Sequence, residues 1–109
     1  MDTDINASDR DMVSAEHRAR RMAKVQHRLG LHARPAADFV RLANTFASEI
    51  RLKKGRRVVN GKSIMGILTL AAAARSRVVV EAEGPDAEEA ARVLSEFLLA
   101  GDHESVTKS

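Results

Sequence analysis

The chain lacks cysteine, tryptophan and tyrosine altogether, and it has only three phenylalanines among its 109 residues. Without cysteine it can form neither a disulfide nor a thiolate metal site, which fits a reducing compartment. With so few aromatic rings it is poorly equipped to stack on bases or sugars. The N-terminal residues lack the basic and apolar regions of a signal peptide, and no apolar run reaches the ~20 residues that span a bilayer. We therefore expect one small cytoplasmic domain without membrane insertion.

Acidic residues are scarce in the middle of the chain, although the formal net charge is only +3. Between Lys24 and Arg77 the only acids are Asp38 and Glu49, whereas acids dominate the C-terminal part. The densest basic cluster consists of Arg51, Lys53, Lys54, Arg56, Arg57 and Lys62. Such a cluster suits a nucleic acid, an acidic protein or a membrane surface, or it is a solvated edge that discourages aggregation. The shortage of aromatic residues argues against nucleic acid, so we expect no nucleic-acid partner.

The spacing of apolar residues predicts seven elements in the order βαββαβα. They are a strand through Ala23, Val25 and His27, a helix from Pro35 to Ala47, a hairpin over 49–60, a short helix capped by Ser63, a strand over Arg77–Glu83, and a helix from Asp86, which with Glu89 resembles a capping box. Each helix has one apolar stripe, which predicts an α+β fold with three helices on one face of a four-stranded antiparallel sheet. Residues 1–20 are expected to be a flexible extension, 21–100 the folded domain and 101–109 a polar C-terminal tail.

A histidine, His32, stands immediately before the first predicted helix and two residues before Arg34. A helix N-terminus offers unpaired amides, here those of Ala33 and Arg34, and a positive dipole end, which together favour phosphate. The planar guanidinium of Arg34 suits phosphate oxygens, and histidine is a nucleophile that can carry a covalent group. The spacing fits two interpretations of His32, a phosphoryl carrier or a residue that merely caps the helix, and it does not decide between them.

A second point of interest is Ser63, at the start of the next predicted helix. A phosphate on this side chain would meet the same kind of dipole and free amides, but the simpler interpretation is an ordinary N-cap serine. Ile64 and Met65 follow it. From the sequence alone these two residues suit either the core or a surface that docks a partner.

No other residues form a recognisable catalytic or metal-binding set. His17 and His103 lie near the ends of the chain and His27 lies on a predicted strand, and none has the spacing or acidic neighbours of a metal ligand. A Ser-His-Asp order, a catalytic carboxylate pair and a glycine-rich nucleotide loop are also missing. We therefore expect no metal, no cofactor and no self-sufficient enzyme.

Two segments, Gly30 to Ala36 and Asn60 to Gly66, resemble the motifs of the HPr family, the histidine phosphocarriers of the bacterial phosphoenolpyruvate-dependent phosphotransferase system. The resemblance covers about residues 21–100 and implies an open-faced β-sandwich. It implies a phosphocarrier that receives a phosphoryl group from Enzyme I on Nδ1 of His32 and passes it to IIA-type proteins. Arg34 would be the phosphate clamp.

The resemblance also implies partner and regulatory roles. Ser63 matches the serine that an HPr kinase/phosphorylase modifies in some lineages, which alters binding to a transcriptional regulator. Ile64, Met65, Arg41 and Lys62 match the partner-binding surface. We further expect a monomer. An alternative is a purely regulatory HPr-like module, of the nitrogen-related or catabolite-control type, that is not coupled to sugar uptake.

Overall fold

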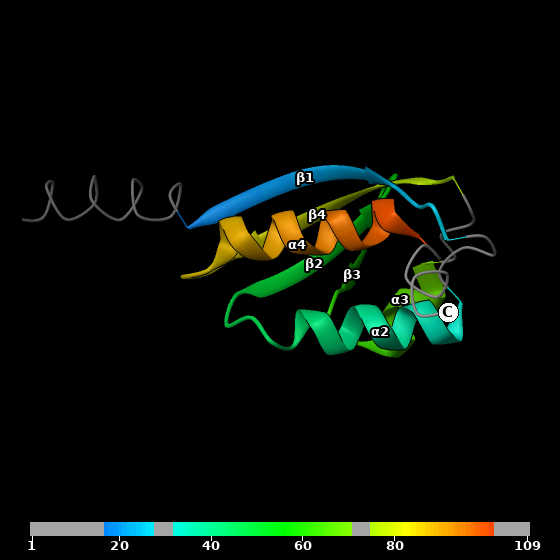
Figure 1. The fold of residues 1–109 in the computed structure, drawn as a ribbon, viewed down its shortest axis with the longest axis horizontal. Helices are drawn as coiled ribbons and strands as arrows, with labels where there is room; N and C mark the ends of the chain where they lie inside the picture. The colour runs from blue at the N-terminus through cyan, green and yellow to red at the C-terminus, as the bar shows by residue number, and fades with distance from the viewer. Residues whose placement is uncertain (1–16, 28–31, 71–74, 102–109) are drawn as a thin grey trace, which may run out of the picture.

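The computed structural model describes residues 17–27, 32–70 and 75–101. These residues form four strands and three helices in the predicted order βαββαβα (Figure 1). The elements are β1 (Arg18–Lys24), α2 (Ala33–Ala43), β2 (Glu49–Lys54), β3 (Arg57–Asn60), α3 (Ile64–Leu70), β4 (Arg77–Glu83) and α4 (Ala87–Ala100). The predicted α+β class and element order are confirmed.

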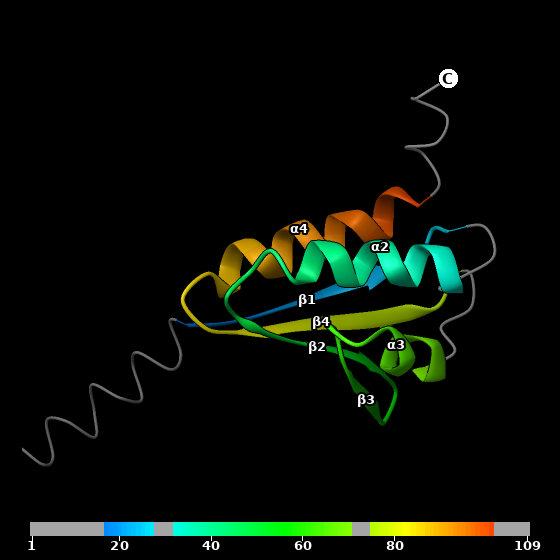
Figure 2. The ribbon, with the colours of Figure 1, turned by 90° about the horizontal axis from the view of Figure 1, so that it is seen from below.

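The strands form one antiparallel sheet in the order β1-β4-β2-β3. The β-branched run of β4 lies in the interior of the sheet, where its Val78, Val80 and Ala82 are buried against the helices. In Figure 2, α2 and α4 lie over one face of the sheet, and α3 lies by β3 and packs against α2. The other face is open, which makes the fold an open-faced sandwich.

The core lies between the sheet and the apolar stripes of the helices. Its largest fully buried side chains are Phe39, Ile50, Leu52, Ile67, Leu70, Leu94 and Leu98. The stripe predicted for α2 is buried through Ala36, Phe39, Val40 and Ala43. Burying such side chains contributes roughly 25 cal/mol per Å² of apolar surface, so this layer is the main source of the domain's stability.

The first strand differs from its prediction. It begins at Arg18, so residues 18–20, expected in the extension, pair with Glu83, Ala82 and Glu81 of β4. It ends at Lys24, and the buried Val25 and His27 follow it. The arginine-rich composition of 18–21 hid the strand, because an open sheet face allows alternate residues to be charged. Residues 1–16 and 102–109 lie outside the described residues.

The capping box predicted at Asp86 and Glu89 is wrong. Asp86 is the N-cap residue of α4, but its carboxylate makes no hydrogen bond to the amides of its own helix. It instead accepts hydrogen bonds from the amides of Ala47 and Ser48 and from the Ser48 hydroxyl. A long-range contact replaces the local one, and it ties the loop after α2 to the start of α4.

Candidate functional site

His32 is exposed and occupies the N-cap position of α2. Its backbone is extended, with φ −95° and ψ −164°, and its carbonyl accepts a hydrogen bond from the Ala36 amide at 2.8 Å. Its side chain makes no capping hydrogen bond. The interpretation of His32 as a side-chain cap therefore has no support in the geometry, and the imidazole is not used to hold the helix.

The helix start beside His32 is buried on one side and exposed on the other. Pro35 and Ala36 are buried and anchor the first turn, whereas Ala33 and Arg34 are exposed. The first amides of a helix have no partner within it, and Pro35 has no N–H to leave unsatisfied. The amides of Ala33 and Arg34, the helix dipole and the Arg34 guanidinium thus form a cationic setting for an anion next to His32.

Ser63 precedes α3 and caps it. Its hydroxyl accepts a hydrogen bond from the Gly66 amide at 3.0 Å, and its carbonyl accepts one from the Ile67 amide at 3.0 Å. The ordinary N-cap role considered from the sequence is therefore present. Ser63 is half-buried at the end of a turn, in which its amide donates to the Asn60 carbonyl.

The turn that presents Ser63 depends on the two residues that begin the second motif, Asn60 and Gly61. The Asn60 carboxamide oxygen accepts a hydrogen bond from the Lys62 amide at 2.8 Å. Gly61 is buried and lies so close to Ile50 that a Cβ atom there would come within 2.5 Å of the Ile50 side chain. The Asn-Gly pair is a known turn signal, but its role in placing Ser63 needs the long-range contact with β2.

Ile64 and Met65 are at the surface, 42% and 69% exposed. This settles the alternative left by the sequence, since neither belongs to the core. They follow Ser63 on α3, which packs against α2, so an apolar patch lies on the same helical layer as His32. Exposed methionine is adaptable and is often found at docking surfaces.

The two cations assigned to partner binding have different surroundings. Arg41 is exposed on α2 and forms an ion pair with Asp38 at 3.2 Å. Lys62 donates from Nζ to the Phe46 carbonyl at 2.8 Å, which links the turn before α3 to the segment after α2. Lys62 therefore also has a structural role, and this contact was missed because no local pattern in the sequence indicates it.

The basic cluster of the hairpin is dispersed over structural contacts. Arg51 and Lys53 both bind Glu81, Arg57 donates to the Thr69 carbonyl, and Lys62 binds the Phe46 carbonyl. Four cations of the cluster therefore take part in contacts that hold the domain together. The absence of a nucleic-acid partner stays a prediction.

Two other histidines, His17 and His27, lie among the described residues. His27 is 4% exposed, and its ring packs on Phe97 with centroids 5.0 Å apart, so it belongs to the core. His17 is exposed before β1, and His103 lies outside the described residues. Within the part of the chain that is described, no three acidic or histidine side chains come together as a metal site. In the same residues, no helix has the length and hydropathy of a membrane span.

Known proteins match this chain over most of the described domain. Residues 19–99 match the family model described as the PTS HPr component phosphorylation site. The phosphocarrier protein HPr of Cupriavidus necator is 45% identical over 64 residues, which is 59% of this chain and 72% of that protein.

Solved structures give the same family. The phosphocarrier protein HPr from Bacillus anthracis has a TM-score of 0.72 and 42% identity, covering 74% of this chain and 96% of that one. The Bacillus subtilis catabolite repression protein Crh has a TM-score of 0.61 and 42% identity, covering 70% of this chain and 87% of that one, and its crystal structure is a swapped, intertwined dimer.

Proposed function

Because the chain belongs to the HPr family of phosphocarriers of the phosphotransferase system, we propose that His32 receives a phosphoryl group from phosphorylated Enzyme I and passes it to an IIA-type protein. The observation that carries this proposal is the exposed imidazole at the start of α2, which makes no capping bond. A ring nitrogen attacks phosphorus, and an N–P bond forms as the donor's bond to phosphorus breaks. The donor keeps that electron pair, and the reverse step delivers the group to the next protein.

The phosphorylated ring needs compensation for its new negative charge. The amides of Ala33 and Arg34 and the Arg34 guanidinium supply it, and both residues are exposed at the helix start. The two amides are held in place by the buried Pro35 and Ala36, so the backbone needs little reorganisation on phosphorylation. The exposed Ile64 and Met65, together with Arg41 and Lys62, are the residues that we propose contact both partners.

Phosphorylation with phosphoenolpyruvate and Enzyme I tests the proposal. We expect one acid-labile phosphate on the wild-type chain and none on His32→Ala. His17→Ala is the matched control, since it removes another exposed histidine and should be labelled normally. We expect Arg34→Gln to be labelled more slowly while its circular dichroism stays unchanged. Undiminished labelling of His32→Ala would refute the proposal.

Ser63 supports a second, regulatory step on the same chain. Its half-buried hydroxyl caps α3 beside the exposed Ile64 and Met65, so a phosphate there adds charge within the proposed docking surface. We propose that an HPr kinase/phosphorylase modifies Ser63 with ATP and that this weakens transfer to His32 and alters binding of a transcriptional regulator. Acid-stable label on the wild type but not on Ser63→Ala is expected. Label retained on Ser63→Ala would place the modification elsewhere.

The purely regulatory alternative is less favoured. The chain keeps His32, Arg34 and the open helix start, which a module acting only through Ser63 does not need. The monomer stays a prediction, because the related Crh forms a swapped dimer in its crystal. Sedimentation of the purified chain at several concentrations decides this point.

A further inference from the structure

The sheet face turned away from the helices carries more cations than acids. Strand register places its residues in rows, which are Arg18–Glu83–Glu49, Arg20–Glu81–Arg51–Asn60, Met22–Val79–Lys53–Val58 and Lys24–Arg77. Six members are cationic and three are acidic. Because alternate residues of each strand point to opposite faces, all of these side chains lie opposite the buried core positions. We call this surface the open face.

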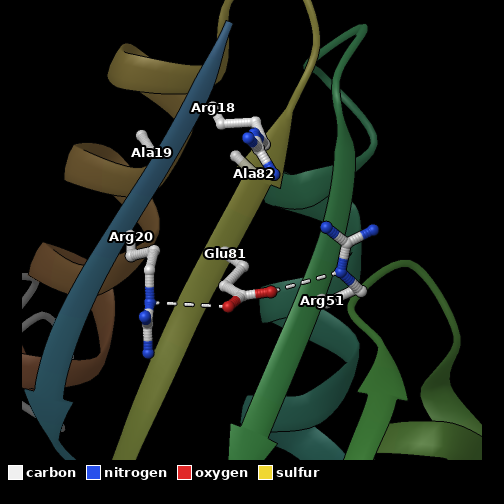
Figure 3. A pocket seen from close by; sticks show the side chains of 6 residues that line it. All are labelled: Arg18, Ala19, Arg20, Arg51, Glu81 and Ala82. Atoms are coloured by element: carbon white, nitrogen blue, oxygen red, sulfur yellow. Dashed lines mark hydrogen bonds and ion pairs between the residues drawn. The ribbon is translucent and has the colours of Figure 1, made fainter. Parts of the chain in front are cut away.

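Acidic residues of the open face already form ion pairs with cations of the same face. Figure 3 shows Glu81 between Arg20 and Arg51, at 3.4 and 3.3 Å from their Nε atoms. Lys53 also contacts Glu81, at 3.0 Å, and its hydrogen bond is the main cause that holds the pKa of Glu81 below its usual range. Lys24 and Arg77, in contrast, are paired across the strands in a row without an acid. Like charges directly opposite each other destabilise a sheet, so this face favours an added anion.

The open face also has apolar side chains between its charged residues. A shallow hollow of about 300 Å³ is lined by Met22 and Val79 and bordered by Arg20, Lys53 and Arg77. Met22 is 67% exposed, an unusual degree for a large apolar residue in a strand. A cationic border around apolar residues suits an acidic peptide that carries scattered apolar side chains.

We propose that the chain's own residues 1–16 occupy the open face. This segment contains the acids Asp2, Asp4, Asp9, Asp11 and Glu16 against the single base Arg10, with apolar Ile5, Met12 and Val13 among them. Its composition is therefore complementary to the open face in charge. No role of the phosphocarrier domain accounts for it, since the family match begins at residue 19.

Residues 1–16 are covalently attached next to the open face, and this favours them as its occupant over an acidic surface of another protein. The segment joins the chain just before β1, a strand at the border of the open face. Sixteen residues span up to about 50 Å, roughly twice the length of the seven-residue β1. A short tether gives an effective concentration near the millimolar range, so several weak exposed ion pairs are sufficient. His32 lies at the start of α2, on the helical layer, and stays accessible.

Paramagnetic relaxation in the full-length chain tests the proposal. Because the chain has no cysteine, Ser8→Cys provides a unique position for a spin label. Met22 and Met65 form a matched pair of reporters, since they are 67% and 69% exposed on the open face and on α3, respectively. We expect the methyl signal of Met22 to be broadened about threefold or more beyond that of Met65. The difference should disappear at about 1 M salt, where the Debye length falls to about 3 Å.

Charge variants and a mixing experiment complete the test. Replacing Asp2, Asp4, Asp9 and Asp11 by Asn should abolish the difference between the two methionines, whereas Glu88→Gln on α4 should leave it intact. Equal broadening of Met22 and Met65, or broadening of Met22 that survives the Asn variant, would overturn the proposal. So would broadening of an isotope-labelled chain by a separate spin-labelled chain at the same strength, because a second copy would then be the occupant.

Discussion

Asp86 is the residue whose replacement tests the packing of the domain most directly. Its carboxylate accepts hydrogen bonds from the amides of Ala47 and Ser48, both at 2.9 Å, and from the Ser48 hydroxyl at 2.6 Å. Ser48 is fully buried, so water cannot replace these bonds at that residue. The bonds lower the pKa of Asp86, with the Ser48 hydroxyl as the main cause. We therefore consider the substitution Asp86→Ala.

The expected magnitude follows from the donors left behind. A buried donor without a partner costs about 1–3 kcal/mol, and Asp86→Ala leaves two such donors on Ser48. The Ala47 amide belongs to an exposed residue, where water compensates in part. We expect the free energy of unfolding to fall by about 3 kcal/mol. At about 4–8 °C per kcal/mol for a domain of this size, Tm should fall by roughly 12–24 °C.

Urea unfolding followed by far-ultraviolet circular dichroism measures this change, since the chain has no tryptophan or tyrosine for fluorescence. Adding Ser48→Ala to Asp86→Ala removes the stranded hydroxyl and should recover about 1 kcal/mol. Glu88→Ala, an exposed acid in the first turn of the same helix, is the control and should change stability by less than about 0.5 kcal/mol. If Asp86→Ala is as stable as the control, the three bonds do not hold the loop to α4, and the reasoning fails.

Two further predictions concern stability. The pKa values of Asp86 and Glu81 are lowered from 3.8 and 4.5, so the stability these carboxylates add is complete above those values and is lost as pH falls through and below them; acid titration of unfolding should show this loss, and a flat profile between pH 5 and about 2 would contradict it. Gly101 has φ +64° and an added Cβ would collide with the Gln26 backbone, so Gly101→Ala should cost more than about 2 kcal/mol in urea unfolding, whereas Gly55→Ala, at φ +61° with open space, should cost about 1 kcal/mol; equal costs would show that the collision is relieved.

The elements of this fold were predictable wherever local periodicity matched the final burial. The α2 stripe and the valine-rich β4 are examples, because their apolar spacing alone defines a buried side. β1 was placed too late because its first residues are arginines, and the register that makes Arg18 and Arg20 part of a sheet depends on β4, some sixty residues away. Local patterns do not contain that partner.

In the candidate site, too, the features set by local sequence were predictable and those set by tertiary contacts were not. The proline-containing first turn predicted a helix from Pro35 to Ala47, whereas α2 runs from Ala33 to Ala43 with His32 as its N-cap residue, so Arg34 lies inside the first turn. Whether the imidazole caps the helix could not be predicted. His32 precedes α2 just as Ser63 precedes α3, and only the structure shows that the Ser63 side chain makes a capping bond whereas that of His32 does not. Ile64 and Met65 likewise needed the structure, because their exposure depends on how α3 packs.

Which charged residues are neutralised depends on how the strands pair and not on how the residues cluster along the sequence. Arg51 and Lys53 appear in the sequence as part of a free basic cluster, yet strand register brings both to Glu81, and Lys62 is used on a main-chain carbonyl. Lys24 and Arg77, which lie outside that basic cluster in the sequence, pair with each other in a row that contains no acid. Cross-strand pairing therefore leaves two neighbouring cations on the open face without an acid in their row, and these are the charges that the proposed N-terminal segment would meet there.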